Sequence, residues 1–373
     1  MHVKHKTLMM KQKLLLFSFC ICFFGSISIS QELTEKEQAY RDSIGALNEE
    51  NATIAASQEA YNKGIELFNQ KSYTQAIESF KASIASDPNF TAAYYNKGVA
   101  ENEADLFAAA AKTLTELIEK DPDYSKAYFQ RARAFQGTGE YTKAEIDYKK
   151  SIQLDPKNPN AYYNYGTLQF LQQDYDGAIK SFTTTIDLKG NIAYAFNDRG
   201  SCYRMKGDYK RALVDYEEAE KKNPNLAFIL NNIGTTKLKM KNYDGAIASF
   251  NRAISIDKNF HLAYNNRGAT QLERDRFDEA LSDFEKCIQV NDKYAPAYAN
   301  IAAVKFKKED YKGAKVAADK AIQLDSEYAT AYVNRGMIKE MLRDMNGACE
   351  DWEKAKELGA ETGGQYASQN CGF

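Results

Sequence analysis

The chain has 373 residues, of which 44% are hydrophobic and 27% are charged, and it contains only six prolines. This composition suits a folded, helical protein. Its 49 Lys and Arg residues nearly balance 51 Asp and Glu residues, so no overall positive field favours nucleic acid as a partner. Three histidines and six cysteines provide little material for a catalytic or metal site.

Residues 1–30 predict a secretory signal peptide. Four lysines between positions 4 and 13 precede the apolar run LLLFSFCICFFGSISIS, and the small residues Ser28 and Ser30 fit cleavage after Ser30. The alternative is an uncleaved membrane anchor formed by residues 14–30, although this run is short for a span of about 20 residues. We therefore expect an exported protein in the periplasm or on the cell surface, associated with the envelope if the anchor is retained.

Residues 31–56 form an acidic and polar leader with a loose helical pattern. This pattern predicts an N-terminal cap helix, a spacer or a partly disordered leader. The sequence does not choose among the three.

From residue 57 onward the sequence repeats every 34 residues. Position 8 of each repeat is Gly or Ala, position 20 is always Ala, and positions 17 and 24 are mostly aromatic. Such a period is typical of a repeat array. The nine units run without an insertion over 57–90, 91–124, 125–158, 159–192, 193–226, 227–260, 261–294, 295–328 and 329–362, and leave 363–373 as a C-terminal tail.

Each unit predicts a pair of helices. Small residues at positions 8 and 20 let the two helices approach closely, and the aromatic residues fill the space around that contact. Segments such as SDPNF and KDPDY end the second helix, because proline disfavours helix at its own position and at the one before it. One pair cannot bury its apolar face alone, so stacked pairs are expected to share a continuous core.

The spacing of small and aromatic residues, followed by Y-x-x-A-I-x-x-F-x-x-A and D-P-N, resembles the tetratricopeptide repeat family. The resemblance covers about four-fifths of the chain. It implies an all-α fold, a right-handed superhelical solenoid of antiparallel helix pairs with a concave groove. It also implies that the partners are other proteins.

Position 6 carries an amide in almost every repeat, although Asn is a mediocre helix former. At about 100° per residue, position 6 points away from the packing stripe of its own repeat and toward the groove. An amide both donates and accepts hydrogen bonds, so a row of amides could grip the backbone of an extended peptide segment. The row consists of Asn62, Asn96, Gln130, Asn164, Asn232, Asn266, Asn300 and Asn334, with Asp198 in the fifth repeat.

This row resembles the asparagine ladder in the superhelical repeats of O-linked N-acetylglucosamine transferase. The resemblance implies the peptide-binding mode of that groove and not the catalysis of that enzyme. The alternative is that these amides bridge adjacent helices, or reflect only the duplication of the repeats. Position 5 is aromatic in the first four repeats, at Tyr61, Tyr95, Phe129 and Tyr163, which predicts either apolar subsites in the groove or stacking against the next repeat.

A basic residue at position 7 is predicted to be structural. Arg appears there in every second repeat from the third onward, and Asp appears at position 23 of the same repeats. Because the two charges appear and vanish together, we expect bidentate ion pairs between the two helices of each such repeat rather than ligand binding. The predicted pairs are Arg131 with Asp147, Arg199 with Asp215, Arg267 with Asp283, and Arg335 with Asp351.

Two cysteines near the C-terminus, Cys349 and Cys371, predict either a disulfide that ties the tail over the last helix or two free thiols. Cys202 and Cys287 occupy packing positions and are expected to be small core residues. The sequence contains no metal-ligand cluster, phosphate-binding loop or nucleophile elbow, so we expect no cofactor, no metal and no enzymatic activity.

The predicted function is an exported scaffold or assembly adaptor that binds extended segments of other proteins in its concave groove. The alternatives are a structural, self-associating envelope protein that uses its convex face, and a binder of glycans or small ligands. The partner, the pathway and the oligomeric state are not encoded in any recognisable motif.

Overall fold

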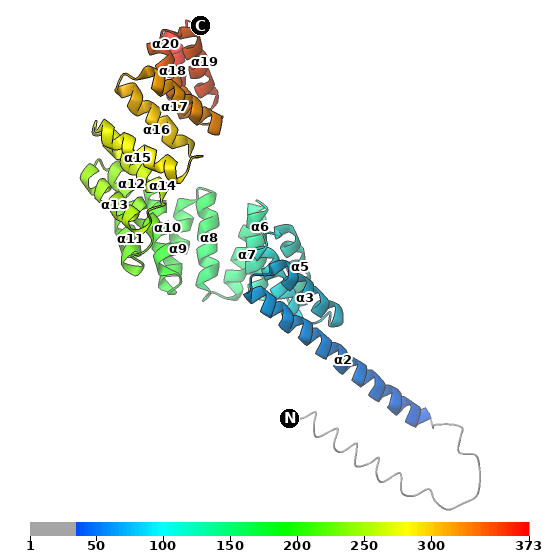
Figure 1. The fold of residues 1–373 in the computed structure, drawn as a ribbon. Coiled ribbons are helices and arrows are strands. Elements are labelled where there is room, and N and C mark those ends of the chain that lie inside the picture. Colours follow the sequence, from blue (N-terminus) through cyan, green and yellow to red (C-terminus); the bar gives the residue numbers. More distant parts are fainter. Residues whose placement is uncertain (1–34, 373) are drawn as a thin grey trace, which may run out of the picture. The chain divides into compact units, whose positions relative to one another are not determined.

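The computed structural model describes residues 35–372, so the predicted signal peptide and its membrane-anchor alternative lie outside the described residues. Within that range the chain forms nineteen α-helices and no strand (Figure 1), which confirms the all-α prediction. None of these helices combines the length and the apolar character needed to cross a membrane.

The described residues divide into two compact units, with the boundary between Ala93 and Tyr94. The first unit contains α2 (Glu35–Asn69) and α3 (Tyr73–Ser86). Helix α2 is a single helix of 35 residues, so most of the leader and the first helix of repeat one are continuous. Its C-terminal half packs on α3, where the hydroxyl of Ser57 donates to the carbonyl of Ser83 at 2.9 Å.

The remaining helices alternate along the chain as first and second members of each repeat. The first helices are α4 (Thr91–Glu103), α6 (Ser125–Gly137), α8 (Pro159–Leu171), α10 (Ile192–Met205), α12 (Ala227–Lys239), α14 (His261–Leu272), α16 (Ala295–Lys307) and α18 (Ala329–Met341). The second helices are α5 (Phe107–Lys120), α7 (Tyr141–Leu154), α9 (Tyr175–Asp187), α11 (Tyr209–Lys222), α13 (Tyr243–Ile256), α15 (Phe277–Val290), α17 (Tyr311–Leu324) and α19 (Met345–Glu357). A further helix, α20 (Glu361–Asn370), follows α19 and contains most of the predicted tail.

The contact between positions 8, 20 and 24 holds each pair together. In repeat six, Ala246 and Phe250 of α13 are fully buried. A Cβ added to Gly234 of α12 would lie 2.5 Å from Cε1 of Phe250, so the absence of a side chain at position 8 lets the aromatic ring lie flat against the first helix.

The turn between the two helices of every repeat uses one residue in the left-handed region at position 15. Only two of these residues are glycines, Gly139 and Gly207, with φ of 80° and 77°. The others carry side chains, at Lys71, Asp105, Gln173, Lys241, Asp275, Glu309 and Arg343. Left-handed backbone is unfavourable for residues with a Cβ, so seven repeats hold a mildly strained turn.

Candidate functional site

The first helices line the inner side of the second unit. From α6 to α18, successive first helices contact one another, whereas each second helix contacts only the first helices on either side of it. Closer spacing on one side of a stack curves it toward that side, so the face formed by the first helices is concave. This face carries position 6 of repeats three to nine.

Hydrogen bonds between repeats form an amide seam along this face. Asn232 donates to Oδ1 of Asn197 at 2.9 Å, and the next two repeats continue the pattern. The same bond joins Asn266 to Asn231 and Asn300 to Asn265, each at 2.9 Å. In every case position 6 of one repeat reaches position 5 of the repeat before it, 35 residues back. The amides therefore bridge adjacent first helices, which is one of the two roles that the sequence allowed.

The amide seam uses only part of the hydrogen-bonding capacity of the position-6 amides. A primary amide has two N–H donors and an oxygen that can accept two bonds. Asn232 and Asn300 each donate one N–H to the preceding repeat, and their second N–H and their Oδ1 have no partner among residues 35–372. All three position-6 amides of the seam remain partly exposed, while their position-5 partners are buried.

The other predicted amides lie in different surroundings. Asn164 donates to the carbonyl of Asn160 in its own helix at 2.9 Å, and Asn334 donates to the carbonyl of Ala299 at 3.2 Å. Gln130 is buried and accepts from Asn102 at 3.2 Å. Asn96 lies on α4 in the second unit, and Asn62 lies on α2 in the first unit, where it accepts from Gln58 at 2.9 Å. The structure thus brings only part of the row into one continuous seam.

The aromatic residues at position 5 contact rings rather than open groove. Tyr61 packs against Phe90 with ring centroids 4.9 Å apart, and Tyr95 packs against Tyr124 at 5.5 Å. Tyr163 lies against the ring of Phe182 and donates its hydroxyl to Asp198 at 2.7 Å. These ring contacts lie within single repeats, so they match neither the open subsites nor the stacking on the next repeat that the sequence suggested. Only the hydroxyl of Tyr163 reaches the next repeat, at Asp198.

Asp198 replaces the usual amide in repeat five. Asn197 and Tyr163 both donate to its carboxylate, at 2.9 and 2.7 Å. Burial nevertheless raises the pKa of the Asp198 carboxyl above its ordinary value, because desolvation of the charge outweighs these two hydrogen bonds.

A small apolar cavity opens on the same face between α16 and α18. Its volume is about 120 Å³, and its lining is Ala302, Ala303, Phe306, Lys307, Asn334, Met337 and Ile338. Repeat eight carries Ala318 where the other repeats carry a larger residue at position 24. A cavity of this size fits one aliphatic side chain and is well below the roughly 300–1,000 Å³ of small-molecule sites.

The four predicted Arg–Asp pairs are present, and each is bidentate. Nε of Arg199 donates to Asp215 at 2.8 Å, and its Nη2 donates to the other carboxylate oxygen at 2.8 Å. The corresponding Nε distances are 2.7 Å for Arg131 with Asp147, 2.8 Å for Arg267 with Asp283, and 2.8 Å for Arg335 with Asp351. The hydrogen bond to Asp215 raises the pKa of Arg199 above its ordinary value. All four aspartates are buried, so these arginines are structural.

Each arginine also reaches the preceding repeat, which sequence reasoning missed. Nη1 of Arg199 donates to Thr183 on α9 at 3.0 Å, so one guanidinium joins α9, α10 and α11. The equivalent acceptors are Thr115 for Arg131, Asn251 for Arg267 and Asp319 for Arg335. The signal was available, because these four acceptors recur every 68 residues at position 25.

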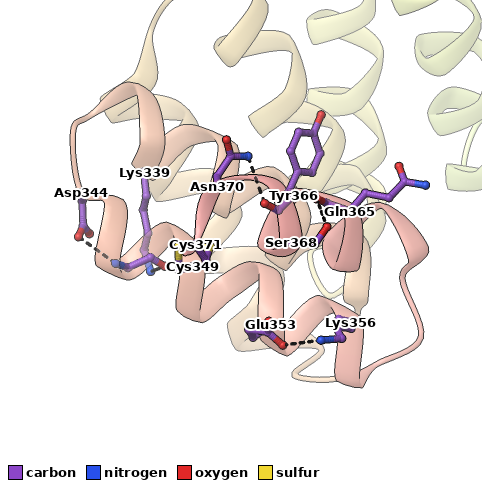
Figure 2. Close-up of a disulfide and its surroundings, with 11 residues drawn as sticks. Lys339, Asp344, Cys349, Glu353, Lys356, Gln365, Tyr366, Ser368, Asn370 and Cys371 are labelled. Atoms are coloured by element: carbon purple, nitrogen blue, oxygen red, sulfur yellow. Dashed lines mark hydrogen bonds and ion pairs between the residues drawn. A yellow bond between two sulfur atoms is a disulfide. The ribbon is translucent and has the colours of Figure 1, made fainter. Parts of the chain in front are cut away.

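The C-terminal end of the array is closed by a disulfide and a ring stack. Cys349 on α19 is bonded to Cys371 just after α20 (Figure 2). Trp352 is fully buried and stacks on Tyr366 of α20, with ring centroids 5.3 Å apart. Helix α20 therefore covers the apolar face that the last repeat would otherwise expose.

Metal-binding clusters and reactive thiols are not found among the described residues. No group of three or more His, Cys, Asp or Glu within residues 35–372 could hold a metal ion. Burial raises the pKa of both Cys202 and Cys287 to about 12, so neither thiol ionises readily at neutral pH. What this face can do is form hydrogen bonds and bury small apolar side chains.

Comparison with known proteins identifies the repeats. Family models described as tetratricopeptide repeat match residues 61–125, 125–158, 147–180, 193–226, 227–260, 261–294 and 295–328. No curated protein matches the chain in sequence.

Many solved structures share the fold, and two of them are compared with this chain. One is a tetratricopeptide repeat protein from Parabacteroides merdae, with 22% identity, a TM-score of 0.57, and coverage of 66% of this chain and 98% of that one. The other is the Cut9–Hcn1 hetero-tetramer of the APC/C, with 15% identity and a TM-score of 0.54. That match covers 81% of this chain but only 58% of the other. At these identities the likeness shows the fold alone.

Proposed function

We propose a function from one premise, which is that this chain belongs to the tetratricopeptide repeat family. Proteins of this family mediate protein–protein interaction and scaffolding. The proposal is that this member is an exported adaptor, and that its concave face binds extended segments of other proteins.

The observation that supports the proposal is that the position-6 amides of the seam have N–H groups that bond to no described residue. Asn232, Asn266 and Asn300 recur at one residue per repeat on the concave face, and each keeps a second N–H without a partner among the described residues. A peptide backbone offers a carbonyl and an N–H at every residue. A row of partly exposed amides can therefore hold an extended segment with little regard to its sequence.

The apolar cavity between α16 and α18 supports a peptide ligand over a small molecule. Its lining combines apolar side chains with the amide of Asn334 and the ammonium of Lys307. One aliphatic side chain of a bound segment would fill it, while Asn334 contacts the adjoining backbone. The cavity would therefore make the face prefer segments with an aliphatic side chain at one position, whereas the amides bind only the peptide backbone.

Two features support export. The basic and apolar pattern of residues 1–30 is typical of a signal peptide. The Cys349–Cys371 disulfide is typical of an oxidising compartment such as the periplasm or the cell surface.

The test is a cross-linking capture of partners from the envelope of the exporting cell, quantified by mass spectrometry. The groove variant changes Asn232, Asn266 and Asn300 to Ala, which removes both the seam bonds and the groove amides. The matched control changes Asn197, Asn231 and Asn265 to Ala, which removes the same seam bonds but keeps the groove amides. Partners lost only in the groove variant support the proposal. Equal capture by the wild type and both variants overturns it.

A further inference from the structure

The N-terminal half of α2 carries apolar side chains that no described residue covers. Ile44, Leu47 and Ile54 are 37%, 52% and 51% exposed. No residue between 38 and 56 is buried, and all of them except the partly exposed Tyr40 are exposed, while the helix continues directly into repeat one. An exposed helix of this length is marginal in water without a partner.

Three exposed apolar residues fit a heptad together with the partly exposed Tyr40 and the polar Asn51. Tyr40, Ile44, Leu47, Asn51 and Ile54 are separated by four, three, four and three residues. This spacing places Ile44 and Asn51 at a positions, and Tyr40, Leu47 and Ile54 at d positions. We call these five residues the α2 seam.

The identity of the seam residues favours one geometry. A β-branched residue at a with Leu at d favours two parallel strands, and a single Asn at an a position fixes the register and the two-stranded state. Ile44, Leu47 and Asn51 supply these three features within eight residues. In a parallel pair of identical chains each Asn51 would meet the Asn51 of the other copy, so both buried amides would have a hydrogen-bond partner.

Two of the flanking pairs bring no like charges together. The g positions Ser43 and Glu50 would face the e positions Asn48 and Ala55 of the other helix. Residues 38–56 hold three acidic side chains and one basic side chain, which disfavours attachment to an anionic membrane surface.

Repeat one anchors the helix and ends the seam. Beyond Ile54 the same helix is held by the Ser57–Ser83 hydrogen bond and by the packing of Tyr61 on Phe80 and Phe90. Because the folded repeat already fixes α2 as a helix, less ordering entropy opposes pairing of its free half.

We propose that the α2 seam, Tyr40 to Ile54, pairs with the same seam of a second copy of this chain as a short, parallel, two-stranded coiled coil. The contact is independent of the peptide-binding face, because it lies on the first unit and uses none of the amide seam. Two copies joined in this way would present two concave faces to one partner, which raises avidity.

Cysteine cross-linking tests the register. In the full chain with Cys20 and Cys22 changed to Ser, Leu47→Cys and Ile54→Cys each place a thiol at a d position, and Glu49→Cys places one on the opposite face. We expect mild oxidation to link two chains through residue 47 and also through residue 54, and to leave the Glu49→Cys variant unlinked. An antiparallel pair could link through only one of the two positions. Linkage at one position alone, or equal linkage of the Glu49→Cys variant, overturns the proposal.

Molar mass measured by light scattering tests the contact itself, at chain concentrations up to about 100 μM. The wild type is expected to approach the mass of two chains, and Ile44→Asp with Leu47→Asp to remain at the mass of one. The matched control, Ala46→Asp with Thr53→Asp, adds the same charge off the seam and is expected to behave as the wild type. A wild type that stays monomeric, or a seam variant that still dimerises, overturns the proposal.

Discussion

At the scale of single residues, each position-6 amide of the seam bonds to the preceding repeat and keeps a second N–H without a partner among the described residues. The angular position of residue 6 predicts that its side chain leaves the packing stripe, and the structure agrees that Asn232, Asn266 and Asn300 are partly exposed. The period did not predict that each amide would reach a buried Asn in the preceding repeat. That contact depends on the distance between neighbouring first helices, which no single-repeat pattern contains.

Glycine in place of a larger residue at the left-handed turn position should raise the stability of the array. Lys241 has φ of 59° at position 15, so Lys241→Gly should stabilise the array by about 0.5–1 kcal/mol. Gly207→Ala, at the equivalent turn, should destabilise it by about 1 kcal/mol. Urea denaturation followed by circular dichroism measures both shifts. A lower midpoint for Lys241→Gly would contradict the account of strain at this position.

Asp198 should make stability depend on pH. Its native pKa lies above that of the unfolded chain, so the protonated form favours folding. This contribution is present below the unfolded pKa of about 3.9 and is lost as pH rises through the native pKa. Asp198→Asn cannot titrate, so its melting temperature relative to the wild type should increase from pH 4 to pH 7. A difference that shrinks over this range would show that the hydrogen bonds from Tyr163 and Asn197 outweigh desolvation.

At the scale of helices, the arginines set the contact between one repeat and the next. The prediction from sequence covered the bond within a repeat, because Arg and Asp appear and vanish together. The third contact, such as Arg199 to Thr183, was missed because Thr and Asn at position 25 are common on helix surfaces. Every second repeat from the third onward is therefore linked by its arginine to the repeat before it. The repeats between them lack this link.

Removing one member of a pair should be costly. Arg199→Leu leaves the buried carboxylate of Asp215 without its guanidinium, and should destabilise the surrounding repeats by about 3 kcal/mol. Replacing both residues with Leu should cost clearly less than the sum of the two single changes. Hydrogen exchange of α9 to α11 in a double-mutant cycle measures this difference. Additive effects would mean that the pair does not act as a unit.

The disulfide should stabilise the C-terminal end of the array. It closes a loop of 22 residues, for which the chain-entropy estimate is about 3 kcal/mol. Cys371→Ser, or reduction, should increase hydrogen exchange in α20 and expose Trp352 to fluorescence quenchers. Exchange in α6 and α7, far along the chain, should not change. Unchanged exchange in α20 would show that the Trp352–Tyr366 stack suffices on its own.

At the scale of the whole molecule, periodicity predicted nearly all of the fold. Nine units of 34 residues, with small residues at positions 8 and 20, predicted the helix pairs and their packing face. The ends were less predictable, because they leave the repeat pattern. Helix α2 continues from residue 35 into repeat one, and the tail forms α20 over Trp352.

The site was predicted in outline and not in detail. The amide row lies on the concave face from α12 to α18, but Gln130 is buried and the position-5 tyrosines pack on neighbouring rings. The cavity between α16 and α18 depends on small residues in one repeat and on the approach of two helices. Only three-dimensional packing reveals such a feature.

The most direct test of peptide binding is the affinity of a captured partner segment, made as a synthetic peptide and measured by fluorescence anisotropy. Changing Asn232, Asn266 and Asn300 to Ala should weaken binding by about 100-fold, at about 1 kcal/mol for each lost hydrogen bond. Changing Asn197, Asn231 and Asn265 to Ala should weaken it by no more than about threefold, because the groove amides remain. Equal affinities for both variants would contradict the account and leave the amide seam as a purely structural feature.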